Sequence, residues 1–360
     1  MEDRGEVEGD APAPRANRDL VGHDAVEREL LRLYQAGRLP HAILFGGPRG
    51  IGKATLAFRF ARFLLARGTM SGGSAGGLAS DPASGVFRRV AAGGHADLFT
   101  VERIWDPQRR RLRGGIVVEH TREIARFLHL TAGEEGWRIV IVDGAEEMNR
   151  NAANALLKIL EEPPRSSLLL LVSHIPGMLL PTIRSRCRRF RLDALSLPLV
   201  TSLLERYRPQ LDAAEGAGLS ALSDGSIGRA LELADSGGLA LYRGLVEILS
   251  HLPRLDIRRL HTLIDTVVSA EGEGPYRALA ELLPQCLGRI AAGGVRRHPS
   301  AAPVIAGEGE AMRRLGGADA ARWASLRHEI EENFVAVREL NLDRKQAMLS
   351  AFFAIAEAAR

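Results

Sequence analysis

Apolar runs and amphipathic stretches alternate along the first half of the chain. Continuous apolar runs, each short enough for one buried strand of a parallel sheet, occur at residues 41–47, 137–143 and 167–174, and a fourth strand is predicted at 96–103. Apolar residues three and four positions apart predict helices at residues 24–36, 53–68, 117–130 and 150–164. Strands that alternate with helices in this way predict an α/β domain with a parallel sheet, ending near residue 192.

The second half of the chain lacks strand signals. Residues 193–240 predict a small helical unit, and residues 241–360 predict a larger all-helical domain. Its clearest pattern is one apolar helical stripe made of Trp323, Leu326, Ile330, Phe334, Val337 and Leu340. Two segments predict disorder: the acidic, Pro/Ala-rich tail at residues 1–18 and a flexible Gly/Ser-rich insertion at about 68–95.

Composition narrows the class of protein. The two cysteines, Cys187 and Cys286, form neither a disulfide framework nor a four-cysteine zinc site. No apolar run approaches the ~18 residues of a membrane helix, and the first residues lack the apolar core of a signal peptide. We therefore expect a soluble cytoplasmic protein with no membrane contact. The net charge of +4 is compatible with phosphate-rich partners.

The first predicted strand leads into a glycine-rich loop, FGGPRGIGKATLA at residues 45–57. Gly47, Pro48, Gly50 and Gly52 allow backbone N–H groups to approach phosphates closely, and the helix that follows adds its positive dipole end. Lys53 would reach the terminal phosphates, in a chain where only three of 48 basic residues are lysines. The segment therefore predicts a phosphate-binding loop.

Two groups that ATP hydrolysis needs are missing. The residue after the loop lysine normally offers a hydroxyl to Mg²⁺, but it is Ala54, and Thr55 is rotated by ~100° around the helix. Asp143 ends the second apolar run, where a metal-associated carboxylate belongs, but Gly144 replaces the glutamate that would polarise water. Ser173, at the end of the third run, could orient a γ-phosphate or a water. We expect no turnover, and a nucleotide could still bind.

Four arginines lie within residues 182–190. One interpretation is a solvent-exposed basic surface. The other is that one of these arginines extends into a neighbouring subunit and contacts the γ-phosphate bound there. The planar, always-charged guanidinium suits this role.

Three segments together resemble one family: HAILFGGPRGIGKATLA, IVDGAEEMNRNAANALLKILEEPP and PTIRSRCRRF. In this order and spacing they resemble the AAA+ clamp-loader family and, within it, the delta-prime subunits of bacterial DNA polymerase III. The resemblance is dense over residues 39–192. It implies an AAA+ domain at 19–192, a helical lid at 193–240 and a helical collar at 241–360 that assembles a pentameric ring.

The resemblance also implies roles for single residues. Arg186 would be an arginine finger that acts in trans on the ATP site of an adjacent gamma/tau subunit. Arg229 and Ser173 fall at phosphate-sensing positions. Many relatives carry a four-cysteine zinc module after the loop helix, where this chain has its glycine-rich insertion, so no zinc is expected.

Three functions remain open at this stage. The first is a non-hydrolysing structural subunit of the clamp loader, with gamma/tau and delta subunits, the sliding clamp and the phosphates of primer-template DNA as partners. The second is an active AAA+ motor, gamma/tau-like or a DNA-repair ATPase, in which Thr55 and Glu146 stand in for the missing groups. The third is a degenerate scaffold that binds no nucleotide.

Overall fold

The computed structural model describes residues 11–66, 77–103, 105–106, 111–112, 115–130, 136–270, 272–295, 303–316 and 320–360. The chain divides into unit 1, Met1–Leu199 with Gly225–Ile227, and unit 2, Val200–Asp224 with Gly228–Arg360. Most of the helical segment expected at 193–240 therefore belongs to the same unit as the helices expected at 241–360.

Unit 1 is built on a five-stranded parallel sheet. Its strand order is β2-β5-β6-β1-β7, and the strands are β1 Ala42–Gly46, β2 Leu98–Val101, β5 Arg138–Asp143, β6 Ser167–Ser173 and β7 Arg188–Arg191. The α/β class with a parallel sheet is thereby confirmed. β7 was not predicted as a strand. It lies at the edge of the sheet and only Phe190 is buried, so its other three residues are exposed arginines and the apolar signal of a strand is weak.

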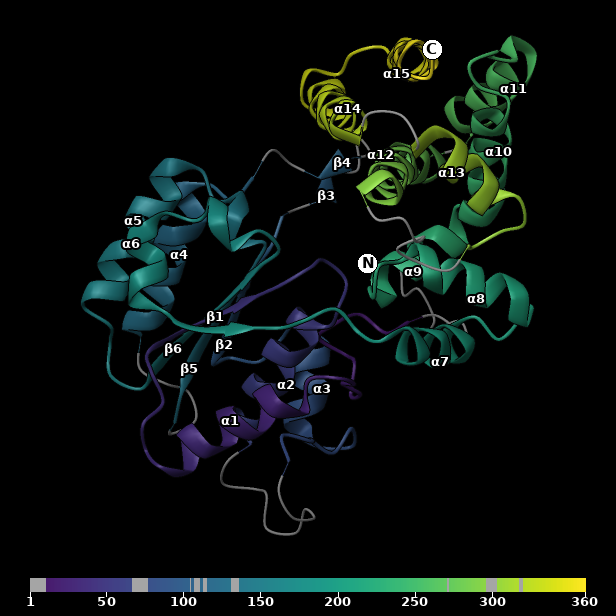
Figure 1. The fold of residues 1–360 in the computed structure, drawn as a ribbon. Coiled ribbons are helices and arrows are strands. Elements are labelled where there is room, and N and C mark those ends of the chain that lie inside the picture. The colour runs from purple at the N-terminus through teal and green to yellow at the C-terminus, as the bar shows by residue number, and fades with distance from the viewer. Residues whose placement is uncertain are drawn as a thin grey trace. The chain divides into compact units, whose positions relative to one another are not determined.

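Helices cover both faces of this sheet (Figure 1). On one face lie α1 Asp24–Gln35, α2 Lys53–Leu65 and α3 Gly85–Ala91, and on the other lie α4 Val118–His129, α5 Arg150–Glu161 and α6 Pro181–Arg186. Ile43 and Phe45 of β1 belong to the first core, and Ala42 and Leu44 belong to the second. Because both faces are buried, the central strands are continuous apolar runs.

Four short elements complete unit 1. They are the antiparallel pair β3 Trp105–Asp106 and β4 Arg111–Leu112, and the 3-10 turns η1 Ala145–Glu147 and η2 Pro176–Met178. The basic turn expected at residues 109–115 includes β4, while 109–110 and 113–114 lie outside the described residues.

Part of the insertion expected to be flexible is ordered. Helix α3 begins after Ser84, whose hydroxyl accepts the Phe87 N–H, and Val86 and Val90 pack into the core that also contains α2. The spacing of these apolar residues within one short helix was hidden by the surrounding glycines and serines. Residues 67–76 lie outside the described part of the chain.

The tail expected to be disordered is held over part of its length. The Arg62 guanidinium, which is fully buried, donates to the carbonyl oxygens of Arg15 (2.8 Å) and Asn17 (2.7 Å). A buried guanidinium needs acceptors, and the tail backbone supplies them. Residues 1–10 lie outside the description.

Unit 2 is helical throughout the part described. Its helices are α7 Leu197–Tyr207 (which begins in unit 1), α8 Ala213–Leu222, α9 Ile227–Asp235, α10 Gly238–Ser250, α11 Ile257–Val268, α12 Gly274–Val295, α13 Glu308–Gly316, α14 Ala320–Leu340 and α15 Arg344–Ala358. The apolar stripe on α14 is buried from Trp323 to Val337, but Leu340 is exposed. Leu340 is the last residue of the helix, beyond the neighbours that cover the stripe.

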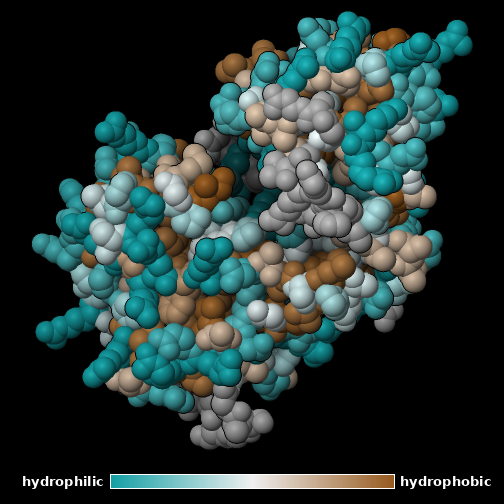
Figure 2. Space-filling model, viewed as in Figure 1, coloured by the Kyte–Doolittle hydropathy of each residue, from teal (hydrophilic) through white to brown (hydrophobic). Residues whose placement is uncertain are grey.

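On the face shown in Figure 2, hydrophilic side chains cover most of both units and small hydrophobic patches interrupt them. None of the helices in the described ranges is long and apolar enough to cross a membrane.

Candidate functional site: a phosphate-binding loop

The loop between β1 and α2 has a backbone that only glycine tolerates at its main turns. Gly47 has φ +153°, and a Cβ there would lie 2.2 Å from the Leu192 carbonyl oxygen. Gly50 (φ +73°) and Gly52 (φ +102°) are also left-handed. The predicted glycines therefore shape the loop, and α2 starts directly after it at Lys53.

Lys53 is folded against this loop. Its side chain is buried, and Nζ donates to the carbonyl oxygens of Gly47 (2.7 Å) and Pro48. An ammonium group has three N–H donors, so one remains for a ligand. The lysine thus both braces the loop and presents a charge, as a phosphate cradle requires.

The ends of β1, β5 and β6 meet at one edge of the sheet. Gly46 pairs in register with Ser173, and Asp143 pairs with Val172. The Gly47 N–H donates to the Ser173 carbonyl oxygen (3.3 Å). Ser173 is fully buried, and its Oγ has no hydrogen-bond partner among the described residues. The predicted residues Lys53, Asp143 and Ser173 therefore lie around one site.

The charges of this edge are coupled. Burial lowers the pKa of Lys53 to about 8, against the carboxylates of Asp143 and Glu146, which raise it. The pKa of Asp143 is raised to about 6, chiefly by burial and also by the Glu102 carboxylate, while Lys53 acts to lower it. Burial thus destabilises the charged forms of both Lys53 and Asp143, and the attraction between them offsets part of this effect. A bound phosphate would further favour the protonated lysine.

The structure also shows where the missing groups would have stood. Ala54 offers no hydroxyl, and Thr55 is 7% exposed within α2. Gly144 has φ +76°, so a glutamate at this position would need a left-handed backbone, at a cost of roughly 1–2 kcal/mol. Glu146, the nearby carboxylate, uses Oε1 to accept the His174 N–H (2.7 Å).

Two histidines of this site were missed in the sequence. His23, the N-cap residue of α1, donates through Nε2 to the Ile51 carbonyl oxygen (2.7 Å) and so supports the loop. Burial lowers the pKa of His174 to about 4, with Lys53 lowering it further, and its Nδ1 has no hydrogen-bond partner in the described chain. His174 could have been predicted as a site residue because it directly follows Ser173. No feature of the sequence indicates that His23 contacts the loop.

Arg186 lies at the surface, at the end of α6. Its guanidinium donates to Glu161 Oε1 (2.6 Å) and to the Thr182 carbonyl oxygen (3.1 Å), both in unit 1. The side chain is 36% exposed. One exposed ion pair and one hydrogen bond to its own helix therefore hold this side chain, and an exposed ion pair is a weak restraint.

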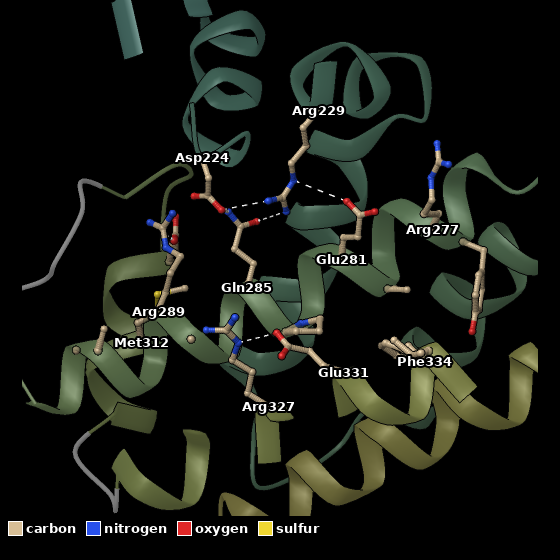
Figure 3. Close-up of a pocket in the computed structure, with 18 of the residues that line it drawn as sticks. Asp224, Arg229, Arg277, Glu281, Gln285, Arg289, Met312, Arg327, Glu331 and Phe334 are labelled. Carbon is tan, nitrogen blue, oxygen red and sulfur yellow. Dashed lines mark hydrogen bonds and ion pairs between the residues drawn. The ribbon is translucent and has the colours of Figure 1, made fainter. Parts of the chain in front are cut away.

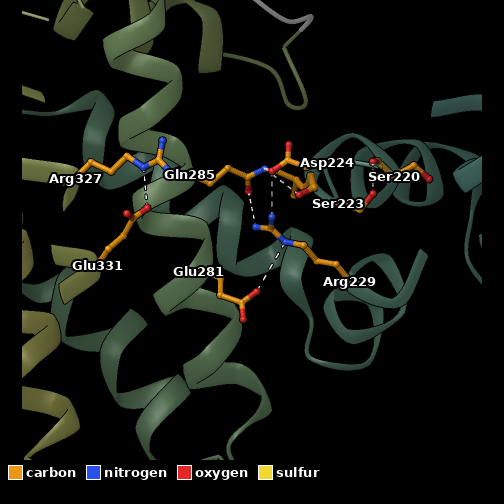
Figure 4. A network of polar contacts seen from close by, with 9 residues as sticks. Ser220, Ser223, Asp224, Arg229, Glu281, Gln285, Arg327 and Glu331 are labelled. Carbon is orange, nitrogen blue, oxygen red and sulfur yellow. Dashed lines mark hydrogen bonds and ion pairs between the residues drawn. The ribbon is translucent and has the colours of Figure 1, made fainter. Parts of the chain in front are cut away.

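Arg229 lies in unit 2, where other groups of that unit hold it. Its guanidinium donates to Asp224 Oδ2 (3.1 Å) and to Gln285 Oε1 (2.9 Å), and it lies 3.8 Å from Glu281 (Figure 4). Arg229, which the resemblance places at a phosphate-sensing position, thus contacts two carboxylates and an amide of its own unit.

The match to a family model falls on the unit that carries the loop. Residues 22–196 match the family model described as DNA polymerase III, delta subunit. Over 189 residues the chain is 40% identical to DNA polymerase III subunit delta' of Pseudomonas aeruginosa, a match that covers 52% of this chain and 53% of that protein. Over 270 residues it is 32% identical to DNA polymerase III subunit tau of Salmonella typhimurium, covering 72% of this chain and 39% of that protein.

The chain thus spans about half the length, or less, of these curated relatives. A solved structure of a DNA polymerase III gamma subunit-related protein from Thermotoga maritima aligns with a TM-score of 0.42 at 19% identity, covering 92% of this chain and 99% of that one. Residues 22–196, which carry the phosphate loop, the strand ends around it and Arg186, thus match the DNA polymerase III delta-subunit family, and over this segment the chain is delta-prime-like.

Proposed function

We propose that this chain is a clamp-loader subunit that does not hydrolyse ATP itself and supplies Arg186 to the ATP site of a neighbouring subunit. One observation carries the proposal. The loop keeps its shape and its buried ammonium at Lys53, while Ala54 and Gly144 replace the metal-binding hydroxyl and the water-polarising carboxylate. Metal positioning and general base catalysis each contribute orders of magnitude to hydrolysis.

The partners follow from the family. Relatives at 40% and 32% identity are named as delta' and tau subunits of DNA polymerase III. We therefore propose that the chain assembles with gamma/tau and delta subunits, and that the assembly acts on the sliding clamp and on primer-template DNA. Contact with DNA would run through arginines to phosphates, without sequence readout.

ATP hydrolysis by the purified chain tests the central claim. We expect no ATP hydrolysis above the buffer background in magnesium, because neither missing group has a replacement in the right place. Lys53→Ala serves as the control for contaminating ATPase and should give the same rate. Magnesium-dependent turnover that is lost in both Lys53→Ala and Glu146→Gln would instead establish the motor alternative.

Nucleotide binding without turnover has a pH signature. Phosphate binding needs the protonated Lys53, whose pKa in the free chain is about 8. Affinity for ADP should therefore fall as the pH rises through 8, by about tenfold between pH 7.5 and pH 9. Isothermal titration of the full chain measures this.

The matched variant is Lys53→Met, which cannot titrate. It should bind ADP more weakly at every pH, with the slope above pH 8 removed. Full affinity of Lys53→Met, or an unchanged affinity of the wild type at pH 9, would contradict a role for this ammonium; no detectable ADP binding would favour the scaffold alternative.

A further inference from the structure

A groove of about 1000 Å³ runs along α12 in unit 2 (Figure 3). Its lining extends along α12 from Tyr276 to Gly293, which at 1.5 Å per residue is a length of roughly 26 Å. The opposite wall comes from α13 and α14. A volume of this size is at the upper end of ligand-binding cavities, and its length is that of a chain segment and not of a compact small molecule.

The floor of the groove is apolar and carries spare hydrogen-bonding groups. Ala280, Pro284 and Phe334 contribute to it from the two long helices. Pro284 has no N–H, so the Ala280 carbonyl cannot accept its usual helical hydrogen bond. The hydroxyl of Tyr276 is buried and has no hydrogen-bond partner among the residues described. Such groups suit a ligand with amide N–H donors and an apolar side chain.

Arginines outnumber carboxylates in the lining of the groove, seven to five. The five carboxylates pair with four of these arginines: Asp224 (3.1 Å) and Glu281 (3.8 Å) share Arg229, Glu308 pairs with Arg289 (2.7 Å), Glu331 with Arg327 (2.8 Å), and Glu273 with Arg344. Three further arginines line the groove. Arg277 forms an ion pair with Glu232 (3.6 Å), which lies outside the lining. Arg313 donates to the Gly309 carbonyl oxygen, and Arg338 is exposed with no ion pair in the described part of the chain.

We propose that this groove binds an extended acidic peptide segment of a partner protein. A length of roughly 26 Å accommodates about seven extended residues. Their carboxylates would pair with Arg277, Arg313 and Arg338, and an apolar side chain would lie on the floor at Ala280 and Phe334. The proposal concerns unit 2 alone and does not depend on nucleotide binding in unit 1.

Binding of a designed probe to the full chain tests this. The probe is a fluorescein-labelled peptide of sequence EDELFED, measured by fluorescence anisotropy, with KKKLFKK as the charge-reversed comparison. We expect the acidic peptide to bind and the basic peptide not to bind. The double substitution Arg313→Glu with Arg338→Glu should weaken the acidic peptide about tenfold or more.

Two further variants keep the test decisive. Ala280→Trp fills the floor and should abolish binding, while Arg243→Glu, at an exposed position of α10 outside the groove, should leave it unchanged. Circular dichroism melting of each variant confirms that it is folded. The proposal is overturned if the acidic peptide does not bind, or if Arg243→Glu weakens its binding as much as the groove variants do.

Discussion

Replacing Arg186 with alanine should slow ATP hydrolysis at the neighbouring subunit's site by about 10³-fold while this chain stays folded. An arginine finger stabilises charge that develops on the transferred phosphoryl group, and a planar guanidinium meets that charge with two donors. Folding should be spared because Arg186 is exposed and its ion pair with Glu161 lies at the surface, where such pairs contribute at most ~1 kcal/mol. Single-turnover hydrolysis by the reconstituted clamp loader measures the rate.

Two variants of the same region serve as controls. Arg189→Ala removes an exposed arginine of β7 and should leave hydrolysis within about twofold of the wild type, although it removes the same charge. Glu161→Gln releases Arg186 from its partner in this chain and should not slow hydrolysis. Normal ATP hydrolysis by a loader that carries Arg186→Ala would show that Arg186 is not an arginine finger. An equal loss of rate with Arg189→Ala would show that the effect comes from the positive charge of this region and not from Arg186 itself.

Replacing Glu308 with alanine should destabilise unit 2 by about 3–5 kcal/mol. This carboxylate is fully buried at the start of α13. Oε1 accepts from the Tyr242 hydroxyl (2.8 Å) and Arg289 Nη2 (2.7 Å), and Oε2 accepts from the N–H groups of Val304 (2.5 Å) and Ile305 (3.3 Å). Alanine would remove the carboxylate that pairs with the mostly buried Arg289 guanidinium, and would leave the other three donors without this acceptor.

Urea unfolding can report this unit separately. Trp323 is buried in α14, and its Nε1 donates to the Leu315 carbonyl oxygen (3.0 Å) in α13, so its fluorescence follows this packing. Trp105 and Trp137, the other two tryptophans, are replaced by phenylalanine in the background chain. Glu310→Ala, an exposed carboxylate of the same helix, should change stability by less than about 0.5 kcal/mol. An equally small effect of Glu308→Ala would show that the donors find other acceptors.

Much of the fold was predictable because it rests on local and periodic signals. The apolar runs that became β1, β5 and β6 are buried on both faces, so they read as unbroken hydrophobic stretches. β7 and α3 were not predicted for the opposite reason. Their burial involves only a few side chains, such as Phe190 and Phe87, and depends on neighbours far along the chain.

The sequence by itself determined the chemistry available to the site. A lysine follows the glycine-rich loop, no hydroxyl stands at Ala54 and no carboxylate at Gly144, and folding cannot add these groups. Only the tertiary structure decided how the groups are used, because contacts between distant residues set burial and pairing. It buried Lys53 and so lowered its pKa, left Arg186 at the surface, and tied Arg229 to Asp224 and Gln285.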